Sequence, residues 1–376
     1  MSAGAHSTAA AELLTERQLN RATLARQLLL ERVDMAPGDA VDHLVGMQAQ
    51  SPRDPYIALW SRLVAFEPDE LALLIWERRA VRVPIMRTTL HLVSARDCLA
   101  HVTKFAPLLA RTLRGTAWGK AVADLDLEEL VRAGRDVLDE HPRTNAELGG
   151  VLAERWPGRD PAALAWAVHY LTPLVQIPPR GVWGQSGRAT WATVDAWLGR
   201  APDPPGPPDE LVLRYLGAFG PATVADARKW SGLTGLREVF ERLRPQLRTS
   251  RDERGRELFD LSDAPRPDPD TPAPPRFLPE YDNLLLSHDD RSRFATSRVG
   301  LTPNPGEGGA VGSLLVDGTF RGLWRLNDEA DAAVLRIQLT TRLPRAEQAA
   351  VREEASGLAG LVRPAASGLD VQFVDV

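Results

Sequence analysis

Two uncharged amides stand one residue apart in the stretch MQAQSPRD, where the hydrophobic pattern otherwise indicates the wall of a core. Gln48 and Gln50 flank Ala49 and precede a Ser-Pro turn. A neutral amide cannot usefully remove a proton, but it can accept a hydrogen bond from water and so orient it. In extended backbone, residues 48 and 50 point to the same side, so the pair could direct one water molecule at a substrate. The alternative is that both side chains cap helices or bond backbone groups.

Other signals of enzyme chemistry are missing from the sequence. No set of His, Cys, Asp and Glu residues has the spacing of a metal site, and no glycine-rich phosphate loop follows a strand. The run from His288 to Asp290 could hold a metal, but such a run more often forms a turn or a helix cap. Nothing near Cys98 indicates a reactive thiolate. We therefore expect neither a metal nor a cofactor.

Local arginine patches make the case for a nucleic-acid partner, because the net charge of -5 does not. Residues 77–87 hold four arginines against one glutamate, and residues 241–256 hold six against three acidic residues. Both patches fall on predicted helix ends and hairpins, where arginine suits contact with phosphate. The candidate phosphate contacts are Arg53, Arg87, Arg291 and Arg293. His91 could contact DNA or bond to backbone.

Hydrophobic periodicity places these residues on an alternating order of helices and hairpins. Helical spacing up to residue 79 gives way to alternation over 81–92, which indicates a hairpin that turns near 87–89. The same order, helices and then a hairpin, recurs twice. Three helices followed by a hairpin is the winged-helix plan, so we predict winged-helix units over 12–115, 124–200 and 208–262. Residues 276–376 contain strand-like stretches and predict a β-rich domain.

Composition sets the broad class of the protein. The chain has 376 residues, of which 44% are hydrophobic and 25% charged, as is ordinary for a globular protein with a sizeable core. A single cysteine excludes a disulfide framework and favours a reducing compartment. The N-terminus has neither a basic start nor a long apolar run, and the longest uncharged stretch, 161–179, indicates a buried helix and not a membrane span. We expect a cytoplasmic, nucleoid-associated protein with no membrane partner.

Three stretches of the chain, GMQAQSPRDPYIALWSRL, RTTLHLV and LPEYDNLLLSHDDRSR, resemble the signature stretches of the AlkZ/YcaQ family of DNA glycosylases. The resemblance covers nearly the whole chain. It implies an α+β fold in which three tandem winged-helix units surround a β-rich, barrel-like C-terminal domain. It also implies that Gln48 and Gln50 position the hydrolytic water. Some members of that family carry Gln and then Asp, whereas this chain has no carboxylate in the triplet.

The activity that the resemblance implies is monofunctional hydrolysis of the N-glycosidic bond of cationic N7- or N3-alkylated purines. Its substrates would include bulky natural-product adducts and interstrand crosslinks in double-stranded DNA, in repair or in self-resistance to a toxin. The chain would act as a monomer. A non-enzymatic winged-helix transcriptional regulator is the alternative, although the sequence shows no coiled-coil heptads for reading paired half-sites. The third hypothesis is a scaffold or interaction protein that has no role on DNA.

Overall fold

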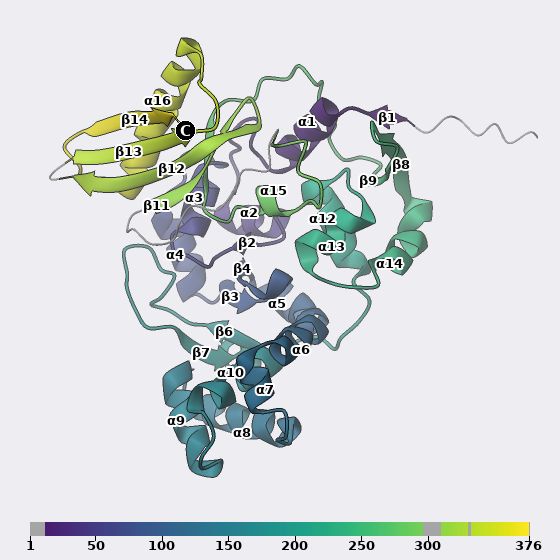
Figure 1. Cartoon of the computed structure of the whole chain (residues 1–376), viewed down its shortest axis with the longest axis vertical. Coiled ribbons are helices and arrows are strands. Elements are labelled where there is room, and N and C mark those ends of the chain that lie inside the picture. Colours follow the sequence, from purple (N-terminus) through teal and green to yellow (C-terminus); the bar gives the residue numbers. More distant parts are fainter. Residues whose placement is uncertain (1–11, 296–309, 330–331, 376) are drawn as a thin grey trace, which may run out of the picture.

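Three β-sheets, of six, three and five strands, and the helices packed on them organise the chain (Figure 1). The computed structural model describes residues 12–295, 310–329 and 332–375. Helices and strands mix along this whole described length, and none of the described helices is both long and apolar enough to cross a membrane. The architecture is therefore mixed α and β, which confirms the fold-class prediction at that level.

The first predicted unit, 12–115, contains four helices, then the expected hairpin, and then two more helices, α5 (Ala95–His101) and α6 (Ala106–Gly115). Its elements up to the end of the hairpin are α1 (Glu16–Arg26), α2 (Pro37–His43), β2 (Met47–Gln48), α3 (Asp54–Trp60), α4 (Pro68–Trp76), β3 (Ala80–Pro84) and β4 (Leu90–Ser94). The hairpin turns at Met86–Thr88, where Arg87 and Thr88 have positive φ angles of 55° and 61°. Strand β4 lies between β3 and β2, so the glutamine stretch forms the edge of this hairpin.

The second predicted unit shares a sheet with the first. Its elements, which follow α7 (Ala117–Ala121), are α8 (Leu127–Glu140), β5 (Arg143–Thr144), α9 (Asn145–Arg155), α10 (Pro161–Leu171), β6 (Leu174–Gln176), β7 (Thr190–Thr193) and α11 (Val194–Leu198). The strand order is β2-β4-β3-β6-β7-β5. Arg82 on β3 pairs with Gln176 on β6, and its guanidinium also donates to the Gln176 side-chain oxygen. The two hairpins are therefore one continuous sheet.

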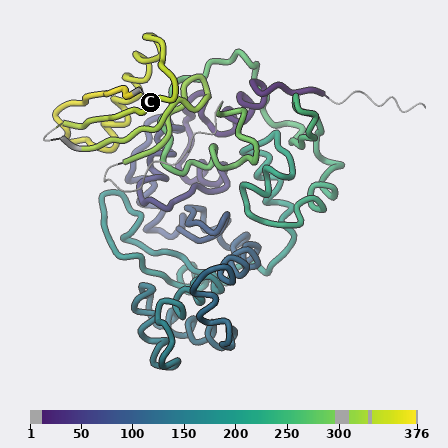
Figure 2. Tube along the Cα trace, viewed as in Figure 1, coloured from purple at the N-terminus to yellow at the C-terminus, as the bar shows by residue number. Residues whose placement is uncertain are grey.

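The third predicted unit repeats the order of elements and gains a strand from the start of the described chain. It contains α12 (Asp209–Phe219), α13 (Val224–Ser231), α14 (Leu236–Leu243), β8 (Leu247–Asp252) and β9 (Glu257–Leu261). Strand β1 (Leu13–Leu14) pairs in parallel with β8, which brings two distant parts of the sequence side by side (Figure 2). The order of helices and hairpins is thus as predicted in all three segments, and their assignment as winged-helix units stays a prediction.

One buried apolar cluster joins the first hairpin to the third unit. It contains Val83 and Val93 of the hairpin together with Tyr215, Phe219 and Trp230 of α12 and α13. Apolar side chains of this size stabilise a fold by roughly 1.5–3 kcal/mol each when fully buried. The third unit is therefore packed directly against the hairpin that carries the glutamine stretch.

The C-terminal region is an open sheet, and the barrel-like prediction was wrong. Its elements are β10 (Arg276–Pro279), α15 (Asn283–Leu286), β11 (Ala310–Val316), β12 (Thr319–Glu329), β13 (Ala332–Leu339), α16 (Arg345–Val362) and β14 (Leu369–Asp375). The strands follow one another in chain order, and β13 and β14 run in parallel through the crossover helix α16. Val351 and Leu358 of α16 are buried in the core of this sheet. Because a helix covers its apolar face, the sheet needs no closure.

Candidate functional site

Gln48 and Gln50 both bond to the turn of the first hairpin. Gln48 is buried at the end of β2, and its Oε1 accepts a hydrogen bond from Arg87 Nη2 at 2.9 Å. Gln50 is exposed just after the strand, and its Oε1 accepts from the backbone N of Leu90 at 3.3 Å. The two amide oxygens are therefore anchored within one segment of four residues, 87–90. The backbone-bonding role that the sequence leaves open is thus present for Gln50.

The Arg87 guanidinium contacts four separate segments of the chain. Its Nη2 donates to Gln48 Oε1 and, at 2.7 Å, to Asn283 Oδ1, and it lies 3.2 Å from His91 Nε2. Its Nη1 donates to the Trp230 carbonyl oxygen at 2.5 Å. The structure therefore gives Arg87 partners inside the protein, in contrast to the phosphate contact that the sequence predicts.

His91 is fully buried and serves the structure of the turn. It lies opposite Gln48 in the strand pairing, and its Nδ1 donates to the Thr89 carbonyl oxygen at 3.0 Å. That bond fixes the tautomer, so Nε2 is left to accept from the Arg87 guanidinium. Burial, and then the charge of Arg87, lower the pKa of His91 to about 3. The ring is therefore neutral at physiological pH, and the backbone-bonding role that the sequence leaves open for His91 is the one present in the structure.

Asn283 and Asp282 belong to the site, and the sequence reasoning missed both. Asn283 Nδ2 donates to the Gly46 carbonyl oxygen at 3.2 Å, while its Oδ1 accepts from Arg87. Asp282 caps the start of α15 and accepts two hydrogen bonds of 2.9 Å from the buried guanidinium of Arg62 on the loop after α3. An Asp-Asn pair within LPEYDN is a helix-start signal that could have drawn attention to these residues. They fix the C-terminal region against the glutamine stretch.

Asp54 is a buried carboxyl group four residues after Gln50. Its Oδ2 has no hydrogen-bond partner among the described residues. Burial, and then the nearby charge of Glu280, raise the pKa of Asp54 to about 8, although hydrogen bonds from Ser51 oppose this shift. The sequence gives no direct signal for this burial, because SPRD reads as an exposed turn. The site therefore contains a carboxyl group that is mostly protonated at neutral pH.

The remaining predicted phosphate contacts divide between surface and interior. Arg293 is buried, and its Nη1 donates to Thr23 Oγ1 at 3.1 Å and to the Pro221 carbonyl oxygen at 2.9 Å. An arginine held in this way cannot reach a phosphate, so that prediction is corrected. Arg53 is exposed beside the glutamine stretch, and Arg291 is half-buried. Both stay predictions.

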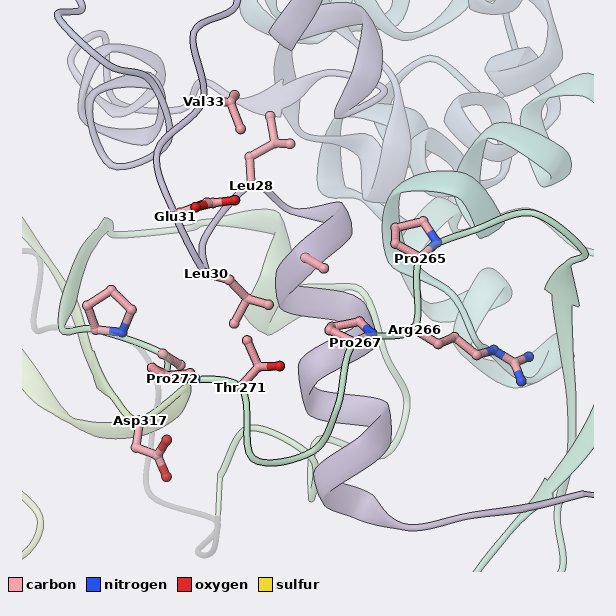
Figure 3. Close-up of a pocket in the computed structure, with 13 residues that line it drawn as sticks. Leu28, Leu30, Glu31, Val33, Pro265, Arg266, Pro267, Thr271, Pro272 and Asp317 are labelled. Carbon is pink, nitrogen blue, oxygen red and sulfur yellow. The ribbon is translucent and has the colours of Figure 1, made fainter.

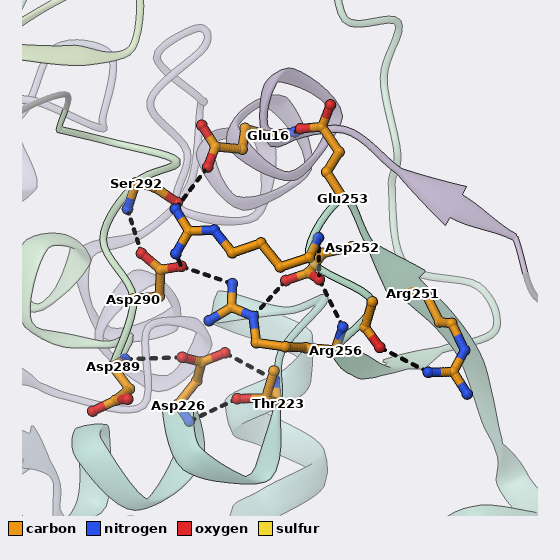
Figure 4. A network of polar contacts seen from close by, with 12 residues as sticks. Glu16, Thr223, Asp226, Arg251, Asp252, Glu253, Arg256, Asp289, Asp290 and Ser292 are labelled. Carbon is orange, nitrogen blue, oxygen red and sulfur yellow. Dashed lines mark hydrogen bonds and ion pairs between the residues drawn. The ribbon is translucent and has the colours of Figure 1, made fainter.

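The arginine-rich third hairpin is largely neutralised by acidic partners (Figure 4). Arg256 lies 2.6 Å from Asp252 and 2.8 Å from Asp290. Arg254 also pairs with Asp290, and Arg244 pairs with Glu241 and Glu257. A surface whose cations are already paired attracts phosphate weakly. The six-arginine patch is therefore a poor DNA contact, in contrast to the prediction.

Other exposed cations lie on two helices that contact the turn to which both glutamines bond. Arg111 on α6 and Arg228 and Lys229 on α13 are exposed, and none of them forms an ion pair with a described carboxylate. Both helices contact the 86–88 turn. Arg111 Nη2 reaches the Gly232 carbonyl oxygen just beyond α13 at 3.4 Å. This set, Arg111, Arg228 and Lys229, forms a positive surface next to the site, which we name the α6–α13 surface.

A large hollow is lined by none of the residues of this site (Figure 3). It has a volume of about 1070 Å³ and is lined by apolar residues after α1, such as Leu28 and Leu30, and by the prolines of the connector at 265–274. Gln27, next to Leu28, lines instead a small hollow of about 10 Å³ beside Gln48 and Asn283. The C-terminal end of α1 thus separates the two, and the large hollow is not part of the site.

Comparisons with known proteins agree on one family. The family model of the AlkZ-like DNA glycosylases matches residues 41–361. The chain is 26% identical over 368 residues to a Streptomyces sahachiroi protein named interstrand DNA cross-link repair glycosylase, covering 91% of this chain and 95% of that protein. The solved structure of the Streptomyces sahachiroi DNA glycosylase AlkZ matches with a TM-score of 0.73 and 22% identity, over 96% of this chain and all of that one. With the family model spanning most of its length, this chain belongs to the AlkZ-like DNA glycosylase family.

Proposed function

We propose that this glycosylase hydrolyses the N-glycosidic bond of cationic N7- or N3-alkylated purines in double-stranded DNA, and that Gln48 and Gln50 position the attacking water. The observation that supports this most is the anchoring of both amide oxygens on residues 87–90. A small hollow lined by Gln48, although not by Gln50, has about the volume that one water molecule needs. A purine does not fit there, so the lesion would lie outside this hollow.

The amides need to orient water and not to deprotonate it. A carbonyl oxygen has two lone pairs, and Gln48 and Gln50 each use one for the turn, which leaves one acceptor position on each. Two acceptors can hold both hydrogens of one water and direct its oxygen at the sugar C1′. As the glycosidic bond breaks, its electron pair goes to the cationic base, which leaves neutral. Water adds to C1′ and its proton passes to solvent.

The relative named interstrand DNA cross-link repair glycosylase is the support for proposing bulky adducts and crosslinks as substrates. The hollow at Gln48 is too small for a purine, so a large adduct would lie outside it. We assign DNA binding to three winged-helix units, 12–115, 124–200 and 208–262, supported by the C-terminal region 276–376 and acting as a monomer. The family assignment does not favour the non-enzymatic regulator.

Base release from a defined lesion tests the proposal. The purified chain is incubated with duplex DNA that carries one N7-methylguanine, and alkali then cuts any abasic site. Gln48→Ala and Gln50→Ala should each slow release by about 100-fold, since misplaced water costs about that much, and leave DNA affinity within about threefold. Gln338→Ala, at an exposed glutamine on β13, is the matched control and should match wild type. Full activity in both variants would move the water site elsewhere.

A further inference from the structure

The geometry points to Arg87 as a positioning residue that sets the direction of the Gln48 amide, and to helix α13 as the part of the fold that holds Arg87. This inference rests on the proposed role of Gln48. Three features of the turn carry it, namely its backbone conformation, the acceptors around the guanidinium, and the bond from that guanidinium to the end of α13.

The backbone of the turn is unfavourable for the residues that occupy it. Arg87 and Thr88 have φ angles of 55° and 61°, in the left-handed region. Residues with a side chain rarely adopt this region, and glycine or asparagine would make the turn at lower cost. A strained arginine persists where its contacts offset the strain. Here the contacts are the four interior acceptors of the Arg87 guanidinium.

The acceptors around Arg87 are all neutral, so its charge stays available to polarise them. They are the side-chain oxygens of Gln48 and Asn283, the Nε2 of His91 and the carbonyl oxygen of Trp230. Burial lowers the pKa of Arg87 to about 10, which leaves it a cation at neutral pH. A flipped Gln48 amide would set its NH₂ group against the guanidinium donors. The cation therefore fixes which end of the amide faces the turn and which end faces away.

Helix α13 connects this cation to the protein surface. The last turn of a helix leaves carbonyl oxygens with partial negative charge, and the Trp230 carbonyl at the end of α13 takes the Arg87 Nη1. The exposed Arg228 and Lys229 lie on the same helix, two residues and one residue before Trp230. A DNA phosphate bound at the α6–α13 surface would thus fix the C-terminal end of α13, and the Trp230 carbonyl at that end would in turn fix Arg87. The orientation of the Gln48 amide would then be fixed when DNA is bound.

A double-mutant cycle tests the inference. Arg87→Lys replaces two donor nitrogens by one, so it should slow single-turnover base release by about 30-fold while the enzyme concentration for half-saturation changes by less than about threefold. In the Gln48→Ala background, the same Arg87→Lys change should alter the rate by less than about twofold, because the residue through which it acts is gone. Thermal unfolding of each variant checks that it is folded.

Asn283→Ala provides a second, milder arm. It removes one acceptor of Arg87 Nη2 and keeps the guanidinium, so it should slow release by about three- to tenfold with Gln48 and have no effect without it. A loss of equal size in both backgrounds, or wild-type rates for Arg87→Lys and Asn283→Ala, would overturn the inference about Arg87. Wild-type release by Gln48→Ala alone would instead overturn the proposed function, and the inference with it.

Discussion

Arg82 Nη2 donates to the carbonyl oxygen of Ala49 at 2.6 Å, which ties the residue between the two glutamines to the adjacent hairpin. Arg82 is buried, and its other Nη reaches Gln176 of the second unit. One side chain therefore fixes both the backbone of the glutamine stretch and the join of the shared sheet.

Replacing Arg82 by methionine should destabilise the protein. The variant keeps the volume of the side chain but leaves the Ala49 carbonyl and the Gln176 oxygen buried without donors, at about 1–3 kcal/mol each. In urea unfolding, this loss in the free energy of unfolding should move the transition midpoint to a lower urea concentration. Arg188→Met, at an exposed arginine of the same region, is the control and should leave the midpoint nearly unchanged. A wild-type midpoint for Arg82→Met would contradict this role.

Asp282→Asn should weaken both stability and base release. The buried Arg62 guanidinium would lose its only carboxylate partner among the described residues, and unpairing a buried ion pair costs about 3–5 kcal/mol. Asn283, next along the chain, would lose its fixed position against Arg87. We expect a lower unfolding temperature together with slower release at temperatures where the variant is still folded. Normal release in a destabilised variant would confine Asp282 to stability.

The buried carboxyl of Asp54 predicts a specific dependence of stability on pH. Its pKa is about 8 in the folded protein and near the ordinary value of 3.8 in the unfolded chain, so between these limits the folded state holds a proton that the unfolded state has lost. The free energy of unfolding should therefore fall as pH rises from about 4 to 8, by at most about 1.4 kcal/mol per pH unit from this group. Asp54→Asn should flatten that slope, measured by urea unfolding at several pH values. Asp136→Asn, at an exposed aspartate, serves as the control and should keep it.

Phosphate contacts at the α6–α13 surface predict how DNA binding responds to salt. Each phosphate neutralised by a cation adds about 0.9 to the slope of log affinity against log salt. The Arg228→Gln/Lys229→Gln double variant should lower that slope by about 2. Arg244→Gln, just before the third hairpin, should leave the slope unchanged, because Arg244 is already paired with Glu241 and Glu257. The reverse pattern would move the DNA-binding surface to the hairpin.

Local sequence patterns predicted most of the helices and hairpins but few of the side-chain contacts in the site. The turn of the first hairpin near Arg87 followed from alternation over residues 81–92, and the polar tip of the third from its charged residues. Which way Arg87 points did not follow, because its partners Trp230 and Asn283 are 143 and 196 residues away in the chain. The burial of Arg293 did not follow either, because its partners Thr23 and Pro221 are 270 and 72 residues away. Sequence showed which residues could do chemistry, and long-range packing decided which of them face a substrate.

The pairing of β3 with β6 also has a mechanical consequence for the duplex. Two hairpins that share one sheet cannot move independently of each other, so the distance between them is fixed before DNA binds. A duplex that touches both must conform to that fixed template, and the energy of any misfit falls on the DNA. An undamaged DNA duplex is stiff and would resist the deformation needed to fit both hairpins. A duplex made more flexible by a lesion would deform more easily.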